Sequence, residues 1–102
     1  MPKGYWVAHV DVTEPEAYKA YVAANAEAFR KYGAKLLVRG GTFEGMAGNN
    51  RSRNVVLEFK DYATALACYR SPEYAKAIAL REGVATADLI IIEGYDGPQP
   101  TD

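Results

Sequence analysis

The stretch that decides the fold is Tyr5-Trp6-Val7-Ala8-His9-Val10-Asp11-Val12, followed at once by Thr13-Glu14-Pro15-Glu16. Its first eight residues are rich in aromatic and β-branched side chains, which is typical of a strand. Thr13 and Glu16 have the spacing of a capping box, in which each side chain bonds to the backbone amide of the other residue. The chain is therefore predicted to pass from a strand directly into a helix.

An apolar stripe continues that helix. Its large side chains recur at spacings of three, four and seven, at Tyr18, Tyr21, Val22, Phe29 and Tyr32. This spacing places them on one face, which is expected to pack on a sheet. Gly33 is predicted to end the helix in a left-handed conformation, and Arg30 and Lys31 suit the negative end of the helix dipole.

The remaining chain predicts two strands, a broken helix and a last strand. Strands at 35–39 and 54–59, joined through Gly40-Gly41 and a polar loop, form a hairpin, and at least one of these glycines should have a positive φ. Asp61 and Ser71 are expected caps for helical segments over 62–70 and from 72 to about 81. With a strand at 87–95, the order is β-α-β-β-α-β. This is the ferredoxin-like α+β fold, with an antiparallel four-stranded sheet and the helices on one face.

The composition indicates one small domain. The chain has 102 residues, 49% of them hydrophobic, which leaves room for a single core. We assign residues 1–96 to the domain and residues 97–102 to a loosely ordered tail, because that tail is polar and contains two prolines. A domain this short leaves much surface exposed, so pairing with a second copy would stabilise it.

Charge and motif content narrow the function classes. The net charge is −1 without a concentration of Lys or Arg, so a nucleic acid is not an expected partner. Apolar runs such as Leu89 to Ile92 are far too short to cross a bilayer, and residues 1–4 do not form a signal-type segment. We therefore expect no membrane partner and a cytoplasmic location. No glycine-rich phosphate loop follows a strand and opens a helix, so no nucleotide cofactor is expected.

Single cysteine and histidine residues limit metal and redox chemistry. Cys68 excludes an internal disulfide and multi-cysteine clusters, and His9 excludes multi-histidine sites within one chain. We therefore expect no metal. The surroundings of Cys68 in the sequence indicate a packed helix face, where a free cysteine behaves as a small hydrophobe.

Alternation of side chains predicts two unlike sheet faces. The apolar face, expected beneath the helices, contains Trp6, Ala8, Val10, Leu36, Val38, Val55, Leu57, Phe59, Ile90 and Ile92. The other face is mixed and contains Tyr5, Val7, His9, Asp11, Leu37, Arg39, Asn54, Val56, Glu58, Leu89, Ile91 and Glu93. A patch that is apolar but also ionisable is explained by a homodimer interface that encloses a cavity.

His9 and Glu58 are the candidate catalytic residues of that mixed face. If the first and third strands are antiparallel neighbours, His9 is expected opposite Val56, with Glu58 one diagonal step away. Histidine titrates near neutrality, and a carboxylate would orient it as a base. In the alternative interpretation, the polar residues of this face only pair with the partner subunit and set the register.

Five segments together resemble the Domain of Unknown Function 1330 family. They are Gly4-Tyr5-Trp6-Val7, Leu37-Val38-Arg39-Gly40-Gly41, Arg53-Asn54-Val55-Val56-Leu57-Glu58-Phe59, Tyr69-Arg70-Ser71-Pro72-Glu73-Tyr74 and Ile92-Glu93-Gly94. The resemblance spans roughly Lys3 to Tyr95. It implies a place in the dimeric α+β barrel superfamily, in which two ferredoxin-like units pack sheet to sheet.

The resemblance implies no particular reaction. The motif positions Arg39, Tyr69, Arg81 and Glu93 become candidate substrate-binding residues, while Ser71 and Glu73 are explained by a helix start. Relatives on this barrel plan include cofactor-free monooxygenases, small-lactone isomerases and haem-dependent enzymes, but fold analogy alone does not assign function. Haem is not expected, because His9 lies on a central strand.

Two hypotheses follow. The protein is a small homodimer that binds or converts a small, partly apolar metabolite without a metal or nucleotide cofactor. Alternatively, it is a non-catalytic structural or ligand-binding homodimer, in which the polar residues only set the register.

Overall fold

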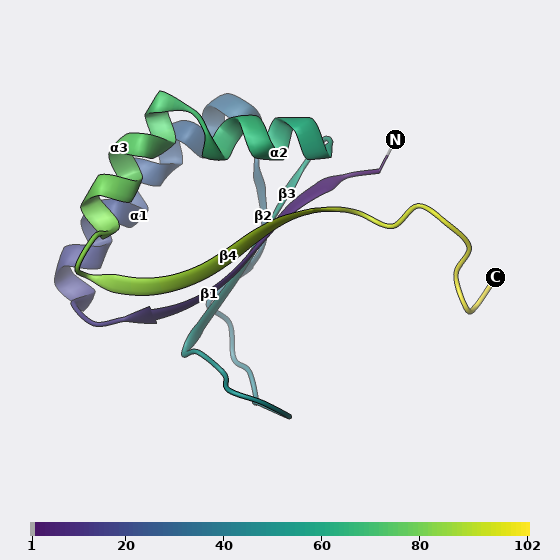
Figure 1. The fold of residues 1–102 in the computed structure, drawn as a ribbon, viewed down its shortest axis with the longest axis horizontal. Coiled ribbons are helices and arrows are strands. Elements are labelled where there is room, and N and C mark those ends of the chain that lie inside the picture. Colours follow the sequence, from purple (N-terminus) through teal and green to yellow (C-terminus); the bar gives the residue numbers. More distant parts are fainter. Residues whose placement is uncertain (1) are drawn as a thin grey trace.

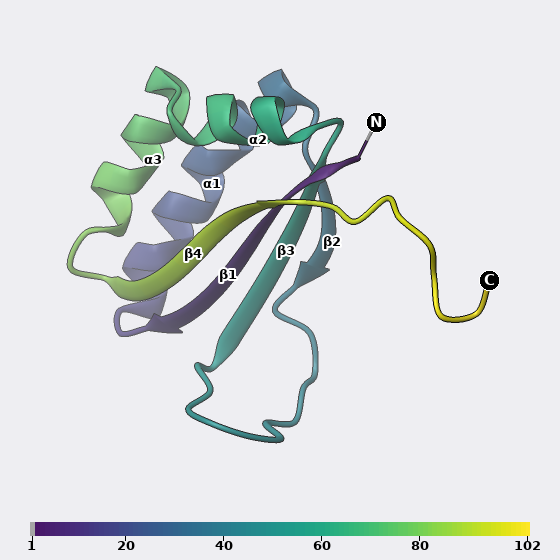
Figure 2. The ribbon, with the colours of Figure 1, turned by 45° about the vertical axis from the view of Figure 1, so that its right-hand side comes forward.

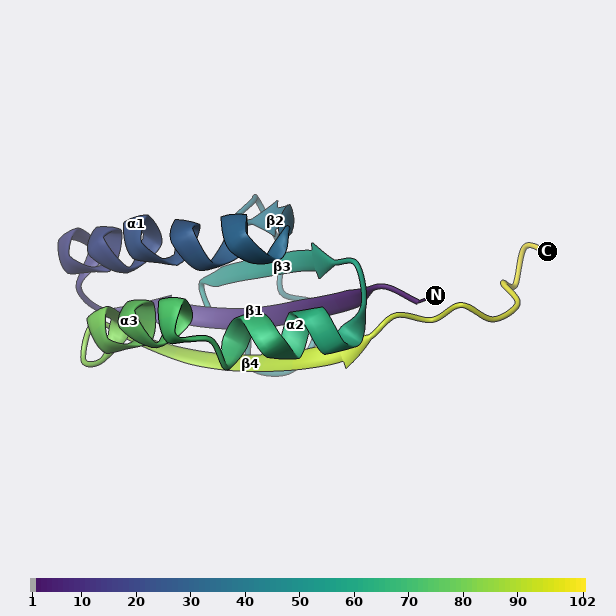
Figure 3. The same ribbon diagram turned by 90° about the horizontal axis from the view of Figure 1, so that it is seen from above.

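One antiparallel sheet carries the fold in the computed structural model, which describes residues 2–102. Its strands are β1 (Gly4–Val12), β2 (Lys35–Arg39), β3 (Arg53–Phe59) and β4 (Ala85–Glu93), in the spatial order β2-β3-β1-β4. The helices α1 (Pro15–Tyr32), α2 (Tyr62–Tyr69) and α3 (Pro72–Arg81) cover one face (Figure 1; Figure 3). The predicted α+β fold is confirmed, with its second helix broken in two.

The ends of α1 test two predictions. The helix ends at Gly33 in the left-handed conformation, with φ of 69°, as predicted. The capping box is wrong: Glu14 is the cap residue, and no side chain caps the helix. The backbone amides of Thr13 and Glu14 instead donate to the carbonyl of Val84, which ties the start of α1 to the chain entering β4.

Side chains cap the two shorter helices as predicted. The Asp61 carboxylate accepts from the amide of Thr64 at 2.8 Å, and the Ser71 hydroxyl accepts from the amide of Tyr74 at 3.1 Å. Ser71 also donates to the carbonyl of Cys68 at 2.7 Å. This buried serine therefore satisfies backbone groups on both sides of the break between α2 and α3.

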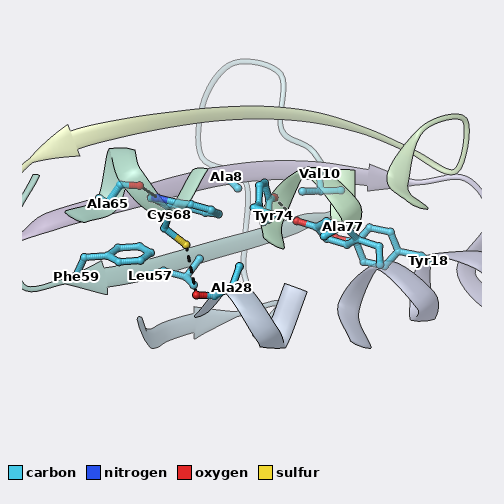
Figure 4. Close-up of a cluster of buried hydrophobic side chains, with 12 residues drawn as sticks. Ala8, Val10, Tyr18, Ala28, Leu57, Phe59, Ala65, Cys68, Tyr74 and Ala77 are labelled. Carbon is cyan, nitrogen blue, oxygen red and sulfur yellow. Dashed lines mark hydrogen bonds between the residues drawn. The ribbon is translucent and has the colours of Figure 1, made fainter. Parts of the chain in front are cut away.

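The core lies between the helices and the sheet, where Leu57 and Phe59 of β3 face Cys68 and Tyr74 (Figure 4). Trp6 is one of its most buried members. Its indole N–H donates to the carbonyl of Ala65 at 2.8 Å, and its ring packs edge-on against Tyr74 with 4.9 Å between centroids. Cys68 is fully buried, and burial raises the pKa of its thiol to about 12. The prediction that Cys68 is a packing residue is confirmed.

The predicted faces of β4 are wrong. Trp6 is paired with Ile91, so Leu89 and Ile91 lie on the helix-covered face. Ile90 and Ile92 lie on the other side of the sheet, named here the open face, where they are 57% and 48% exposed. The reason is that Leu89 to Ile92 are all apolar, so the run has no alternation from which its faces could be assigned.

A β-bulge in β2 overturns a second face assignment. Leu36 is paired with Leu57, but Val38 is paired with Val56, so the register shifts between Leu36 and Val38. One extra residue inverts the faces of everything after it. Val38 therefore lies on the open face, and Arg39 lies on the helix-covered face.

Two segments extend beyond these layers. The 40–52 connection between β2 and β3 hangs from one end of the sheet, and the chain after β4 runs away from it (Figure 2). In the C-terminal segment after β4, the Tyr95 hydroxyl donates to the carbonyl of Pro98 at 2.7 Å. Residue 1 of the predicted domain lies outside the described residues.

Candidate functional site

A cavity of about 50 Å³ lies between the helices and the sheet. Its walls are mostly aliphatic and aromatic and include Trp6 and Phe29, together with six polar residues: Tyr18, Tyr21, Asn25, Arg39, Arg53 and Arg81. Among residues 2–102, no carboxylate, histidine or cysteine lines it. The polar side of the cavity is therefore cationic.

Arg53 enters this cavity from the first position of β3. Its guanidinium lies over the ring of Tyr18, 5.8 Å from the centroid. Its Nε is buried and has no hydrogen-bond partner. A buried N–H without a partner is costly, so this atom marks a place where a ligand oxygen would be stabilising.

Arg81 reaches the cavity from the last turn of α3. Its guanidinium lies over the ring of Tyr21 at 5.3 Å from the centroid, and its Nη1 donates to the Tyr74 hydroxyl at 3.3 Å. The hydroxyls of Tyr21 and Tyr74 are themselves 2.5 Å apart. A hydrogen-bonded chain therefore links α1, α3 and the arginine.

The hydroxyls of Tyr18 and Tyr74, at and beside the cavity, are hydrogen-bond donors rather than bases. Burial raises the pKa of Tyr18, and burial together with Tyr21 raises the pKa of Tyr74. Their hydroxyls consequently keep their protons near neutral pH. The cavity contains cationic guanidinium groups and O–H donors, which suits it to binding and orienting a negatively charged oxygen.

The open face carries a different hollow, of about 420 Å³, lined by His9, Asp11, Asn49, Asn50, Arg51, Asn54 and Asp88. Nδ1 of His9 lies 2.7 Å from Oδ1 of Asn54. Arg51 pairs at 2.8 Å with each of Asp11 and Asp88. The charged groups there already have partners within the chain.

The predicted pairing of His9 with Glu58 is wrong in its geometry. His9 is opposite Asn54, while Glu58 is opposite Tyr5. Asn54 and Glu58 are four positions apart on β3, which separates the two side chains by about 13 Å at the usual rise of a strand. The expected register was two residues out, so Glu58 cannot orient the imidazole of His9.

The other predicted residues lie in three places. Arg39 and Arg81 come together in the cavity. Tyr69 packs against the rings of Trp6 and Tyr74, at 5.6 and 5.3 Å between centroids, and does not line the cavity. Glu93 is exposed at the end of β4, where it pairs with Gly4, while Glu58 pairs with Tyr5. Neighbouring positions of β1 face opposite sides of the sheet, so the prediction that Glu93 shares a face with Glu58 is wrong, and Glu93 does not line the cavity either.

Sequence reasoning missed Arg53, Asn25 and the tyrosine hydroxyls as site groups. A signal for Arg53 was present, because it has the same parity as Val55, Leu57 and Phe59, which form the apolar face of β3. A charged residue at such a position marks a polar place beneath the helices. The helical pattern identifies Tyr18 and Tyr21 only as core residues and gives no signal for a role of their hydroxyls.

Residues 2–102 provide neither a metal-binding cluster nor a membrane-spanning helix. No group of three or more His, Cys, Asp or Glu side chains is arranged to hold a metal ion. No helix there has both the length and the apolar character that a membrane span requires.

Comparison with known proteins gives a family and a shared fold. The family model described as "Domain of unknown function (DUF1330)" matches residues 3–95. No curated protein matches the chain in sequence. A Rhodopseudomonas palustris protein of unknown function is 18% identical, with a TM-score of 0.75, over 94% of this chain and 85% of that one.

Two further solved structures extend the comparison. SnoaB, a cofactor-independent oxygenase from Streptomyces nogalater, is 11% identical with a TM-score of 0.62, over 98% of this chain and 99% of that one. A dimeric ferredoxin-like protein of unknown function from Thermobifida fusca is 13% identical with a TM-score of 0.61, over 90% and 91%. At these identities the likeness establishes the fold alone.

Proposed function

The chain belongs to the DUF1330 family of domains of unknown function, and on that premise we propose that it binds or converts a small, partly apolar metabolite in the cavity between helices and sheet. The observation that carries the proposal is the lining of this cavity. Apolar walls surround a few convergent polar groups, which is the usual character of a small-molecule site. The proposal includes no metal or nucleotide cofactor.

The volume of the cavity limits the size of the metabolite that can bind. A water molecule needs roughly 10–15 Å³ on the same measure, so the 50 Å³ cavity has room for about four water-sized groups before any side chain moves. A larger molecule would have to displace a flexible side chain such as Arg39, which is exposed. The ligand is therefore a small molecule.

The side chains also limit the chemistry. A conversion here would use guanidinium groups and tyrosine hydroxyls to stabilise negative charge that develops on the substrate. Because no histidine, cysteine or carboxylate of residues 2–102 lines the cavity, the reacting atoms would be those of the substrate itself. The similar fold of SnoaB, described as a cofactor-independent oxygenase, is compatible with such chemistry but does not establish it.

The same lining favours one alternative. A cavity without a general base also fits a protein that binds its ligand and does not convert it. The two functions separate after a ligand is found: an enzyme consumes the ligand, whereas a binding protein releases it unchanged.

We include a homodimer in the proposal because of the open face. Five aliphatic side chains there, Val7, Val38, Val56, Ile90 and Ile92, lie on neighbouring strands and are half-buried or exposed. An aliphatic surface of this kind is unfavourable in water and favours burial against a second copy. The Thermobifida fusca protein of similar fold is described as dimeric, which supports this assembly.

Trp6 offers a direct test of the cavity. It is the only tryptophan of the chain, it is 1% exposed and it lines the cavity, so its fluorescence should change when a ligand enters. We would titrate the protein with a library of small carboxylates, amides, alcohols and ketones. A saturable change with at least one compound is expected.

A pair of variants makes the test specific. Asn25→Phe places a ring in the cavity and should abolish the response, whereas Glu27→Phe places the same ring at an exposed position of the same helix and should preserve it. Circular dichroism would confirm that both variants fold. If no compound changes the emission of the folded protein, or if both variants respond like the parent, the cavity is not the binding site.

A further inference from the structure

Three arginines from separate elements converge on one cavity without a carboxylate. Arg39 comes from β2, Arg53 from β3 and Arg81 from α3. The ion pairs found within residues 2–102 involve Lys19, Lys31 and Arg51, and none involves these three arginines. The rings of Tyr18 and Tyr21 balance part of the positive charge of Arg53 and Arg81.

Local backbone features bring these side chains together. Without the β-bulge between Leu36 and Val38, Arg39 would lie on the open face, so the bulge turns its side chain toward the cavity. Gly40 leaves the space that the Arg53 guanidinium occupies. Arg81 lies seven residues after Tyr74 on α3 and donates to its hydroxyl, so its side chain runs back along the helix. The β-bulge, Gly40 and the hydrogen bond from Arg81 to Tyr74 thus each position one arginine of the cluster.

The cluster lacks a partner of opposite charge. The Arg53 Nε is buried and unpartnered, and a buried N–H donor without an acceptor is costly. A guanidinium matches the two oxygens of a carboxylate by parallel N–H donors, and it keeps its charge at any pH of interest. An anionic ligand would satisfy both requirements at once.

We propose that this cavity selects a small organic carboxylate, with its oxygens on Arg39, Arg53 and Arg81 and its hydrocarbon part against Trp6 and Phe29. The inference rests on the proposed function and names its ligand class. The apolar walls favour an acid with a short hydrocarbon chain over inorganic phosphate, which has no apolar part. At roughly 10–15 Å³ for each water-sized group, the 50 Å³ volume holds about three to five non-hydrogen atoms, so an acid of about six such atoms enters when the exposed Arg39 side chain shifts.

Butyrate and butyramide are the probes that separate charge from shape. They have similar size and hydrocarbon content, but only butyrate is an anion at pH 7. We expect butyrate to change the Trp6 emission with a Kd at least about tenfold lower than that of butyramide, and inorganic phosphate to bind more weakly than butyrate. In an NMR titration, the Arg53 Nε–H signal should shift with butyrate.

Variants assign the effect to the cluster. Arg53→Gln should weaken butyrate binding by roughly tenfold or more, and Arg53→Lys should restore part of it by keeping the charge without the fork of donors. Arg30→Gln, at an exposed position on α1, removes the same charge outside the cavity and should have no effect. Circular dichroism and urea unfolding would confirm that each variant folds.

The outcomes separate this inference from the function on which it rests. Equal binding of butyrate and butyramide, unaffected by Arg53→Gln, would overturn the carboxylate proposal while leaving a neutral small-molecule site. Tighter binding of inorganic phosphate than of butyrate would overturn the choice of a carboxylate. A failure of every probe and every library compound to alter Trp6 emission would refute the proposed function itself.

Discussion

A Cβ atom at Gly40 would lie 2.5 Å from Nη1 of Arg53. Because glycine has no Cβ, the guanidinium of Arg53 can pack directly against the backbone at this position. Gly40 also has φ of 65°, in the left-handed region that other residues rarely adopt. The prediction that a glycine of this pair has a positive φ is therefore confirmed for Gly40. Position 40 therefore requires glycine for two separate reasons, the positive φ and the close approach of the Arg53 side chain.

Gly40→Ala should accordingly affect stability and the site together. We expect a loss of about 1–2 kcal/mol in the free energy of unfolding from the left-handed backbone alone, measured by urea unfolding. Displacement of Arg53 should also weaken butyrate binding. Gly41→Ala is the matched control, because a Cβ there meets no atom within 4 Å and its φ is ordinary. Equal stability and binding of the two variants would show that Gly40 has neither role.

The hydrogen bond between the Tyr21 and Tyr74 hydroxyls should stabilise the packing of α1 on α3. Tyr21→Phe and Tyr74→Phe should each lower the free energy of unfolding by about 1–3 kcal/mol, because each leaves a buried polar group with fewer partners. The double variant should cost less than the sum, since both single changes break the same bond. A fully additive double-mutant cycle in urea unfolding would contradict a direct interaction.

Asp11, which binds the end of the 40–52 connection through Arg51 and Ser52, should make the free energy of unfolding sensitive to acid. The amide of Ser52 and the guanidinium of Arg51 donate to this carboxylate and lower its pKa. Its contribution is thus fully present above the unfolded value of about 3.9 and is lost as pH falls through the lower folded pKa. Asp11→Asn should lessen the fall in stability between about pH 5 and pH 2. Urea unfolding at several pH values measures this fall, with Glu44→Gln in the exposed loop as the control. A pH profile of Asp11→Asn that matches the parent would exclude this role.

The open face should hold two copies together. Light scattering of the parent in dilute solution should give the mass of a dimer, and Val56→Lys at the centre of the face should give a monomer with its secondary structure retained. Leu80→Lys, which changes an exposed aliphatic residue on α3, should leave the dimer intact. A monomeric parent would overturn the dimer proposal without affecting the cavity within each chain.

The order of elements could be predicted from the sequence because its signals are local. Gly33 ends α1, and Asp61 and Ser71 cap α2 and α3, since each depends on a backbone conformation or a hydrogen bond within a few residues. The alternation in β1 was strong enough to place Trp6, Ala8 and Val10 beneath the helices. These features need no knowledge of distant parts of the chain.

Only the tertiary structure decided the site, because strand faces and register depend on pairing between distant segments. Leu89 to Ile92 are apolar on both sides, so pairing with β1 alone assigns their faces. The bulge in β2 moved Arg39 from the expected open face into the cavity, and the pairing of β1 with β3 placed His9 opposite Asn54, far from Glu58. A change of one residue inverts a face and a change of two moves a side chain by about 7 Å. A sequence pattern with a period of two residues does not specify either shift.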